Sequence, residues 1–178
     1  IIIRHPGAQI SSILNMFNKG ALKELQTALN FYVDHIKSQP RFQKYYQLTE
    51  QIGYHGSLAD KLIIWWIINN EVMLDDLKSS NMNYKIVYHE DLSENPFEIV
   101  QDIFDFCNMQ SDIQVKNYIQ SSSTWQGPTA SGVDTNRHSK KYYREKIDAV
   151  ERDLKQKIDS AFLQYNLIDE LALPYGTL

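Results

Sequence analysis

The sequence predicts an α/β fold, in which helices flank a parallel sheet and the C-terminal portion is rich in helices. Two short runs, IIIR and YKIVYHEDL, contain the β-branched and aromatic residues that favour strands. About eighty residues of mostly helical periodicity separate them, and parallel strands need a crossover connection of this kind. The hydrophobic content of 43% suffices for a core. We therefore expect residues 1–178 to form a single domain.

The N-terminal part begins with a predicted strand over 1–4, which leads into helices. Pro6 suits the first turn of a helix, and apolar residues then recur at helical spacing up to position 17. A second helix is predicted over 21–38 and ends before a proline. The polar and aromatic segment 41–57 contains two glycines, and it predicts an irregular lid or loop with at most a short helix.

The rest of the chain contains a second strand and further helices. Residues 59–77 predict a helix that is buried on more than one side, because Trp and Ile side chains occur all around it. The second strand is predicted over 84–92, and a helix with a face of Phe, Ile and Val over 97–106. A loop rich in Ser, Thr and Gly follows at 121–139, a length typical of functional or disordered segments. The last predicted element is a long charged helix over 140–167.

Two strands alone do not make a stable parallel sheet, because an isolated pair cannot bury both of its faces. The chain starts directly at a strand and has no initial Met. We therefore expect the domain to be N-terminally incomplete, with a preceding half that supplies further strands.

Composition narrows the classes of function. A net charge of −4 argues against a surface for a nucleic-acid polymer, although a small basic pocket for one anionic ligand remains compatible with it. The single cysteine, Cys107, excludes an internal disulfide and a cysteine-based zinc cluster, and it fits a reducing compartment such as the cytoplasm. No run approaches the roughly 18 apolar residues of a membrane span. Compartment and oligomeric state stay open.

Polar side chains follow both predicted strands. Arg4 and His5 end the first strand, and His89, Glu90 and Asp91 end the second. Because ligands of open α/β sheets bind beyond the carboxyl ends of the strands, this edge is the candidate site. Structural roles are also open to these residues: the two acidic side chains could cap the turn or connect loops, and the histidines could be hydrogen-bonded framework.

Arg4 and Ser12 are candidate ligands for one phosphate. The guanidinium presents a fork of donors, and the helix that starts at Pro6 adds its N-terminal amides. Ser12 lies about two helical turns into that helix, from where its hydroxyl could contact the same group. Alternatively, Arg4 pairs with an acidic residue of the second strand end and Ser12 is an ordinary helix residue.

The segment IIIRHPGAQISS resembles a part of the sulfotransferases that use 3′-phosphoadenosine 5′-phosphosulfate (PAPS). In that family an Arg ends a strand, Pro follows two residues later and Ser eight residues later, as Arg4, Pro6 and Ser12 do here. YKIVYHEDLSENPFEIVQDIFDFCNM is similar to the family's second landmark, a strand that runs into Tyr-Glu-Asp-Leu, an Asn/Asp-Pro turn and an amphipathic helix. NRHSKKYYREKI bears a weaker likeness to the family's closing segment.

The resemblance implies a P-loop-like parallel sheet flanked by helices, with PAPS lying across the strand ends and no metal. It implies transfer of a sulfuryl group from PAPS to a hydroxyl or amine of a small-molecule or glycan acceptor. Arg4 and Ser12 would bind the 3′-phosphate of PAPS. Arg137, or alternatively Lys140 or Lys141, would close over the same nucleotide.

The chain departs from the family pattern at several positions. His89 stands where the family usually has Tyr, and the late loop lacks the Arg-Lys-Gly run of cytosolic members. No equivalent of the phosphosulfate-binding loop with its Lys, or of the catalytic base, is found in the sequence. Sulfuryl transfer depends on positioning, charge stabilisation and a base. The catalytic residues are therefore unknown and expected upstream, and this segment alone is expected to be inactive.

Two other classes of function are open. A nucleotide or small-molecule kinase of P-loop type would also bind phosphates at strand ends, but it requires a Gly-rich Lys-Ser/Thr loop and an Asp for magnesium, and the sequence shows neither. A non-catalytic, sulfotransferase-like interaction domain is the second alternative. The acceptor cannot be named from the sequence, although residues 21–57 are expected to shape its pocket.

Overall fold

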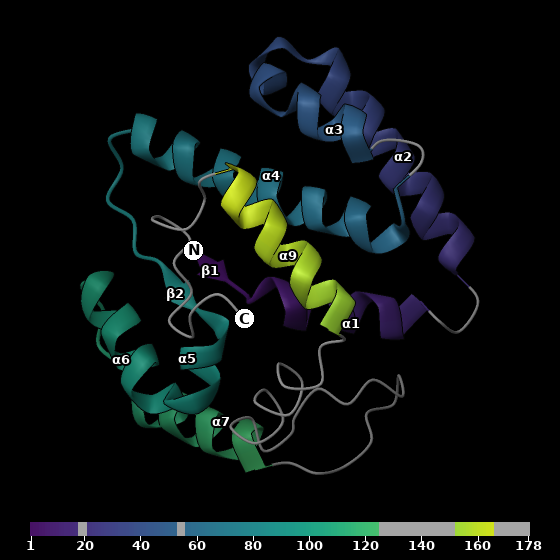
Figure 1. Cartoon of the computed structure of the whole chain (residues 1–178). Coiled ribbons are helices and arrows are strands. Elements are labelled where there is room, and N and C mark those ends of the chain that lie inside the picture. The colour runs from purple at the N-terminus through teal and green to yellow at the C-terminus, as the bar shows by residue number, and fades with distance from the viewer. Residues whose placement is uncertain (18–20, 53–55, 125–151, 166–178) are drawn as a thin grey trace. The chain divides into compact units, whose positions relative to one another are not determined.

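The computed structural model describes residues 1–17, 21–52, 56–124 and 152–165 (Figure 1). The chain divides into two compact units. Unit 1 comprises residues 1–5 and 83–149, and unit 2 comprises residues 6–82 and 150–178.

Unit 2 is helical throughout its described part. Its elements are α1 (Pro6–Phe17), α2 (Leu22–Ser38), the 3₁₀-helix η1 (Pro40–Tyr45), α3 (Tyr46–Ile52), α4 (Leu58–Ser79) and α9 (Arg152–Tyr165). Helix α4 contacts α1, α2, α3 and α9, so that it is the central element of the unit (Figure 1). The predicted helices over 21–38 and 59–77 are confirmed, as is the described part of the last one.

Helix α4 has well-defined ends and is buried on several sides. The Ser57 hydroxyl accepts a hydrogen bond from the Asp60 N–H, and the Asp60 carboxylate accepts one from the Ser57 N–H, which forms a capping box. Asn81, with a φ of 55°, follows its last turn in the left-handed conformation that Asn tolerates. Its apolar side chains face the core of unit 2, which contains Ile36, Tyr45, Leu48, Ile64 and Ile68.

The prediction of an irregular lid over 41–57 is wrong for most of that segment, which forms η1 and α3. Pro40 starts the 3₁₀-helix, where a missing N–H costs nothing. Tyr45 and Leu48 are then buried against α4. Burial of these side chains stabilises a helical backbone in a stretch that has no glycine, since Gly53 and Gly56 lie beyond the last residue of α3.

The described part of unit 1 contains the two strands and three helices. Its elements are β1 (Ile2–Ile3), β2 (Val87–Tyr88), α5 (His89–Glu94), α6 (Pro96–Phe106) and α7 (Ile113–Thr124). The strands pair in parallel, Ile2 with Val87 and Ile3 with Tyr88. The two runs, predicted to be strands of one parallel sheet, are therefore direct neighbours, and the helix predicted over 97–106 is confirmed as α6.

The predicted fold class, a P-loop-like parallel sheet flanked by helices, is wrong for the described part of the chain. Its sheet has only two strands of two residues each, and its other regular elements are helical. Of the predicted strand over 84–92, only Val87–Tyr88 pair, while His89–Glu94 form α5. Acidic residues in the first turn of α5 interact favourably with the helix dipole, which helps to end the strand there. Residues 121–124, predicted as loop, belong to α7, a helix that sequence periodicity did not predict.

None of the helices that the structure describes has the length and hydrophobicity needed to cross a membrane.

Candidate functional site

The ends of β1 and β2 bring a group of polar side chains together in unit 1. We call Arg4, His5, His89, Glu90 and Asp91 the strand-end cluster. Arg4 and His5 follow β1 directly, and the other three form the first turn of α5 directly after β2. Because the strands are parallel and in register, both sets lie at the same edge. The predicted grouping of these residues is therefore confirmed.

Glu90 connects the two strand ends. Its side chain is buried, and its Oε1 accepts a hydrogen bond of 3.1 Å from the backbone N–H of His5. Burial raises the pKa of the Glu90 carboxyl, whereas this hydrogen bond and the positive charge of Arg4 act in the opposite direction. The structural reading of Glu90, a residue that ties loops together, is confirmed.

His89 is kept neutral by its surroundings. Burial lowers the pKa of its imidazole, and the positive charge of Arg4 lowers it further. The half-buried guanidinium of Arg4 thus acts electrostatically on both His89 and Glu90. A neutral imidazole offers one N–H donor and a guanidinium offers five, which is the chemistry of an anion-binding edge.

The other predicted ligands belong to different parts of the chain. Ser12 lies on α1 with a partly exposed side chain, and α1 belongs to unit 2, whereas Arg4 belongs to unit 1. The convergence of Arg4 and Ser12 on one phosphate therefore stays a prediction. Arg137, Lys140 and Lys141 lie outside the described residues.

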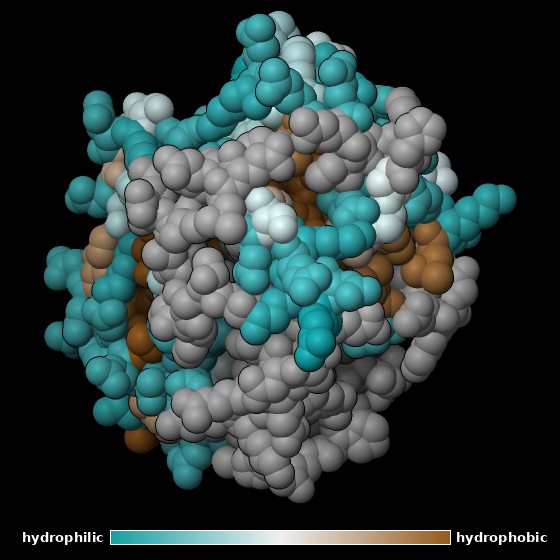
Figure 2. Space-filling view, in the orientation of Figure 1, coloured by the Kyte–Doolittle hydropathy of each residue, from teal (hydrophilic) through white to brown (hydrophobic). Residues whose placement is uncertain are grey.

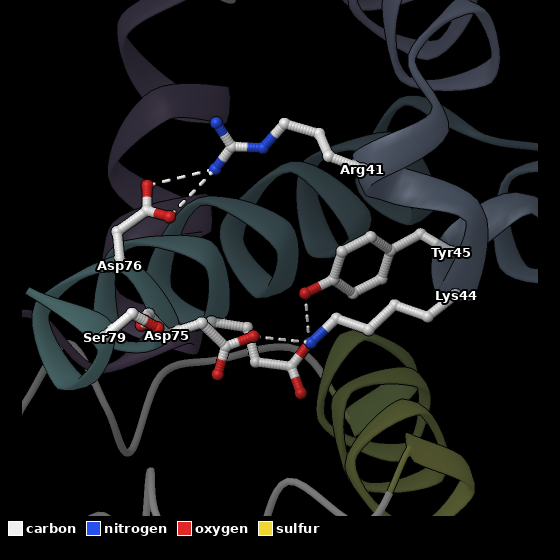
Figure 3. A network of polar contacts seen from close by, with 7 residues as sticks. Arg41, Lys44, Tyr45, Asp75, Asp76 and Ser79 are labelled. Carbon is white, nitrogen blue, oxygen red and sulfur yellow. Dashed lines mark hydrogen bonds and ion pairs between the residues drawn. The ribbon is translucent and has the colours of Figure 1, made fainter.

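A second polar group, on η1 and α4 of unit 2, was not found by sequence reasoning (Figure 3). The Tyr45 hydroxyl donates to Glu71 Oε2 at 2.5 Å, and Lys44 Nζ donates to Asp75 Oδ2 at 2.8 Å. Burial, aided by the hydrogen bond to Glu71, raises the pKa of Tyr45 far above its ordinary value, so the phenol stays protonated. The signal in the sequence was the spacing of carboxylates at i and i+4 on α4.

This network holds η1 against α4. Arg41 pairs with Asp76 at 3.0 Å, the residue that follows the Lys44 partner Asp75 on α4, and Figure 3 shows both basic side chains extending from η1 toward the carboxylates. Because each of these carboxylates accepts a hydrogen bond from a basic or phenolic group of η1, the network joins η1 to α4 and is not a ligand site.

Lys61 is a further polar residue that the sequence did not single out. Its side chain is only 1% exposed, and its Nζ donates to the Asn30 side-chain oxygen at 2.7 Å. Gln26 donates to the same oxygen at 3.3 Å. Burying an ammonium group is costly without hydrogen bonds, and this one joins α4 to α2.

The described residues contain no group of three or more His, Cys, Asp and Glu side chains that could hold a metal ion. No protein-family model, curated protein or solved structure matches the chain.

Proposed function

We propose that this protein is a PAPS-dependent sulfotransferase, which transfers a sulfuryl group to a hydroxyl or amine acceptor, and that Arg4 binds the 3′-phosphate of the donor. The observation that carries the proposal is the parallel pairing of β1 with β2, which puts Arg4 at the same edge as the residues that follow β2. That pairing joins the two segments on which the family resemblance depends.

Arg4 is the member of the strand-end cluster that favours a phosphate, whereas Glu90 and Asp91 at the same edge are acidic. Arg4 brings a permanent positive charge. His89, whose pKa is lowered by burial and by Arg4, is neutral and adds no second positive charge. Ser12 would add its hydroxyl to the same phosphate.

The proposal assigns binding rather than chemistry to these residues. In sulfuryl transfer the acceptor oxygen or nitrogen forms a bond to sulfur, the bond from sulfur to the phosphate oxygen breaks, and a base takes the acceptor proton. The 3′-phosphate is remote from the reacting sulfur, so Arg4 would contribute through binding and orientation. No residue of the chain is assigned as the base.

Binding of 3′-phosphoadenosine 5′-phosphate tests the proposal. We expect calorimetry on the full chain to show saturable binding of this nucleotide without Mg²⁺, and weaker binding of 5′-AMP, which lacks the 3′-phosphate. Arg4→Gln should weaken binding of the bisphosphate by about tenfold or more, close to 1.4 kcal/mol, and leave 5′-AMP unaffected. Arg41→Gln, a surface arginine on η1, is the matched control and should change neither affinity.

Several results would contradict the proposal. Equal affinities for the bisphosphate and 5′-AMP would mean that no 3′-phosphate site exists. Binding that requires Mg²⁺ would instead favour a kinase. Indifference to all of these nucleotides, in protein that unfolds cooperatively, would leave a non-catalytic interaction domain.

A further inference from the structure

The junction of α6 and α7 in unit 1 exposes large apolar side chains. Phe106 ends α6, Met109 lies in the connection and Ile113 begins α7, with exposed fractions of 46%, 58% and 67%. We call these three residues and their connection the α6–α7 corner. Hydrophobic surface also shows among hydrophilic residues on the left of Figure 2, where Figure 1 places α6. Apolar groups that gather at one place on a surface are typical of an interaction site.

The corner is a fixed structure and not a loose loop. The Met109 N–H donates to the Phe104 carbonyl at 2.8 Å, and the Asn108 N–H donates to the Asp105 carbonyl at 3.0 Å. With Asn108 in the left-handed conformation, these bonds form a Schellman motif at the end of α6. In that motif the residue at the position of Met109 commonly packs onto the helix, but here it is mostly exposed.

Further bonds hold the start of α7. The Asp112 carboxylate accepts from the Val115 N–H at 3.0 Å and so caps the helix, while Ser111 donates to the Gln101 side-chain oxygen at 2.6 Å. Because the backbone of the corner is already ordered, binding of a ligand here costs little conformational entropy, which favours affinity.

Helix α6 itself has an unusual burial pattern. Its sequence alternates apolar and acidic residues with the period of an amphipathic helix, yet none of its residues is buried. Phe97 at its start is 49% exposed. Ile99, Val100, Ile103 and Phe104 on its apolar face are half-buried, so the apolar surface open to a partner lies at its two ends, at Phe97 and Phe106.

The charge around the corner indicates which partner fits. From Pro96 to Lys116 the sequence contains four acidic residues and one basic one, Lys116 on α7. Asp102 forms an ion pair with Lys85, whereas Asp105 and Asp112 accept hydrogen bonds from neutral donors, which leave their charges in place. A complementary surface would carry Lys or Arg around an apolar side chain.

The negative charges of Asp105 and Asp112 argue against three other partners for the corner: a membrane, a nucleic acid and a second copy of the chain. Anionic lipid headgroups and nucleic acids would be repelled by Asp105 and Asp112. A second copy of the chain, bound through the same face, would bring two acidic patches together, because a twofold interface pairs each patch with itself.

We infer that the α6–α7 corner is a docking site for a basic amphipathic segment of a partner protein, with a large apolar side chain on Met109 and its neighbours and Lys or Arg opposite Asp105 and Asp112. This inference does not depend on the proposed sulfotransferase activity. A helical segment suits this surface, because apolar anchors that recur at helical spacing can contact the exposed side chains of the corner.

Cys107 gives a direct way to test the inference. It is exposed, lies between Phe106 and Met109, and is the single cysteine of the chain. An environment-sensitive fluorophore on Cys107 would report binding at the corner. The probe is a 14-residue helical peptide with Leu at i, i+3, i+4 and i+7 and Lys on its flanks, compared with a peptide of the same pattern with Glu in place of Lys.

We expect the Lys peptide to change the fluorescence saturably and the Glu peptide to bind at least tenfold more weakly. Met109→Ser and Asp105→Asn should each weaken binding of the Lys peptide several-fold. Phe31→Ser, which changes a 70% exposed side chain on α2, is the matched control and should have no effect. Calorimetry with unlabelled protein should give the same order of affinities, which shows that the label does not block the site.

Four results would overturn the inference. The Lys peptide could show no binding in both fluorescence and calorimetry. It could also bind the Met109→Ser protein as tightly as the wild-type protein. The Glu peptide could bind as tightly as the Lys peptide. Finally, the signal could come from anionic vesicles or from raised protein concentration alone, which would assign the corner to a membrane or to a second copy of the chain.

Discussion

The two units of the chain differ in what they bury. The core of unit 2 is made of aliphatic and aromatic side chains from α2, η1, α3 and α4, with Ile64 and Leu48 almost completely enclosed. Unit 2 also buries two polar residues, Thr49 and Lys61, but among many apolar ones. The described part of unit 1 buries His5 and Glu90 with only three apolar residues, Ile3, Val87 and Ile119, and α6 has no fully buried residue. The difference is one of proportion: the described part of unit 2 has a large apolar core, and the described part of unit 1 has a small one in which polar groups make up a larger share.

Physical chemistry gives the reason for this contrast. Each square ångström of apolar surface removed from water stabilises the folded state by about 25 cal/mol, and the core of unit 2 is built from such surface. A buried carboxyl or imidazole instead loses hydration and must be compensated by hydrogen bonds or charges. Unit 1 places such groups beside Arg4, and sites of this kind are where perturbed pKa values gather in proteins.

The largest effect is expected in the core of unit 2. Ile64→Ala should lower the free energy of unfolding by about 2–5 kcal/mol, because it removes buried methylene groups and leaves a cavity beside Ile68 and Leu48. Urea unfolding followed by circular dichroism measures the change. Phe97→Ala removes a larger side chain from α6 of unit 1, but from an exposed position, and should cost less than about 1 kcal/mol. Equal losses in the two variants would remove the contrast between the units.

The next effect concerns the connection between the strand ends of unit 1. Glu90→Ala should lower the free energy of unfolding by about 1–3 kcal/mol, since the buried N–H of His5 loses its acceptor. Glu90→Gln keeps an oxygen at that position and should lose much less. The same urea titrations distinguish the two variants. If both lose stability alike, the charge of Glu90 beside Arg4 matters more than its hydrogen bond to His5.

Much of this architecture could be predicted from local sequence patterns, and the failures have physical causes. Helices α2, α4 and α6 follow from apolar spacing and from capping residues such as Ser57. The two strands follow from composition, and their parallel direction from the helical stretch between them, whereas their direct pairing is a finding of the structure. The extent of the sheet could not be predicted in this way, because strand length depends on partners that are distant in sequence.

The candidate site shows the same division. Its grouping at one edge could be predicted from the polar residues that follow each strand, and so could the connecting role of Glu90. The fastening of Tyr45 to Glu71 and the buried pairing of Lys61 with Asn30 could not, since each joins residues more than twenty-five positions apart. Local periodicity carries no information on such contacts. The segment 41–57 was mispredicted for the same reason, because its helices depend on burial against α4.

A smaller effect is expected from the protonation of His89. The folded state lowers its pKa below the ordinary value of 6.5, through burial and then through Arg4, so the unfolded state binds more protons as pH falls below about 6.5. Stability contributed by the neutral imidazole is present above that pH and lost on acidification. Glu90 has the opposite slope, because its pKa is raised above 4.5, and its contribution is lost as pH rises.

The comparison of variants isolates the histidine. Between pH 7.5 and pH 5.5, wild-type protein should lose more unfolding free energy than His89→Gln, as measured by urea titration at each pH. His35→Gln, on the exposed face of α2, is the matched control and should lose as much as wild type. Identical pH profiles for wild type and His89→Gln would show that unit 1 does not carry this titration.

The smallest effect is expected at the surface of unit 2, where Arg41 and Asp76 pair at 3.0 Å with side chains that are 55% and 65% exposed. Water screens both charges, and holding two long side chains costs conformational entropy, so a double-mutant cycle should give a coupling of at most about 1 kcal/mol that decreases with added salt. The variants are Arg41→Ala, Asp76→Ala and both together, measured by urea unfolding. A coupling as large as the loss in Ile64→Ala would mean that the polar network of Figure 3, and not the apolar core, holds η1 to α4. Unit 2 would then be held together by surface ion pairs, and its apolar core would no longer distinguish it from unit 1.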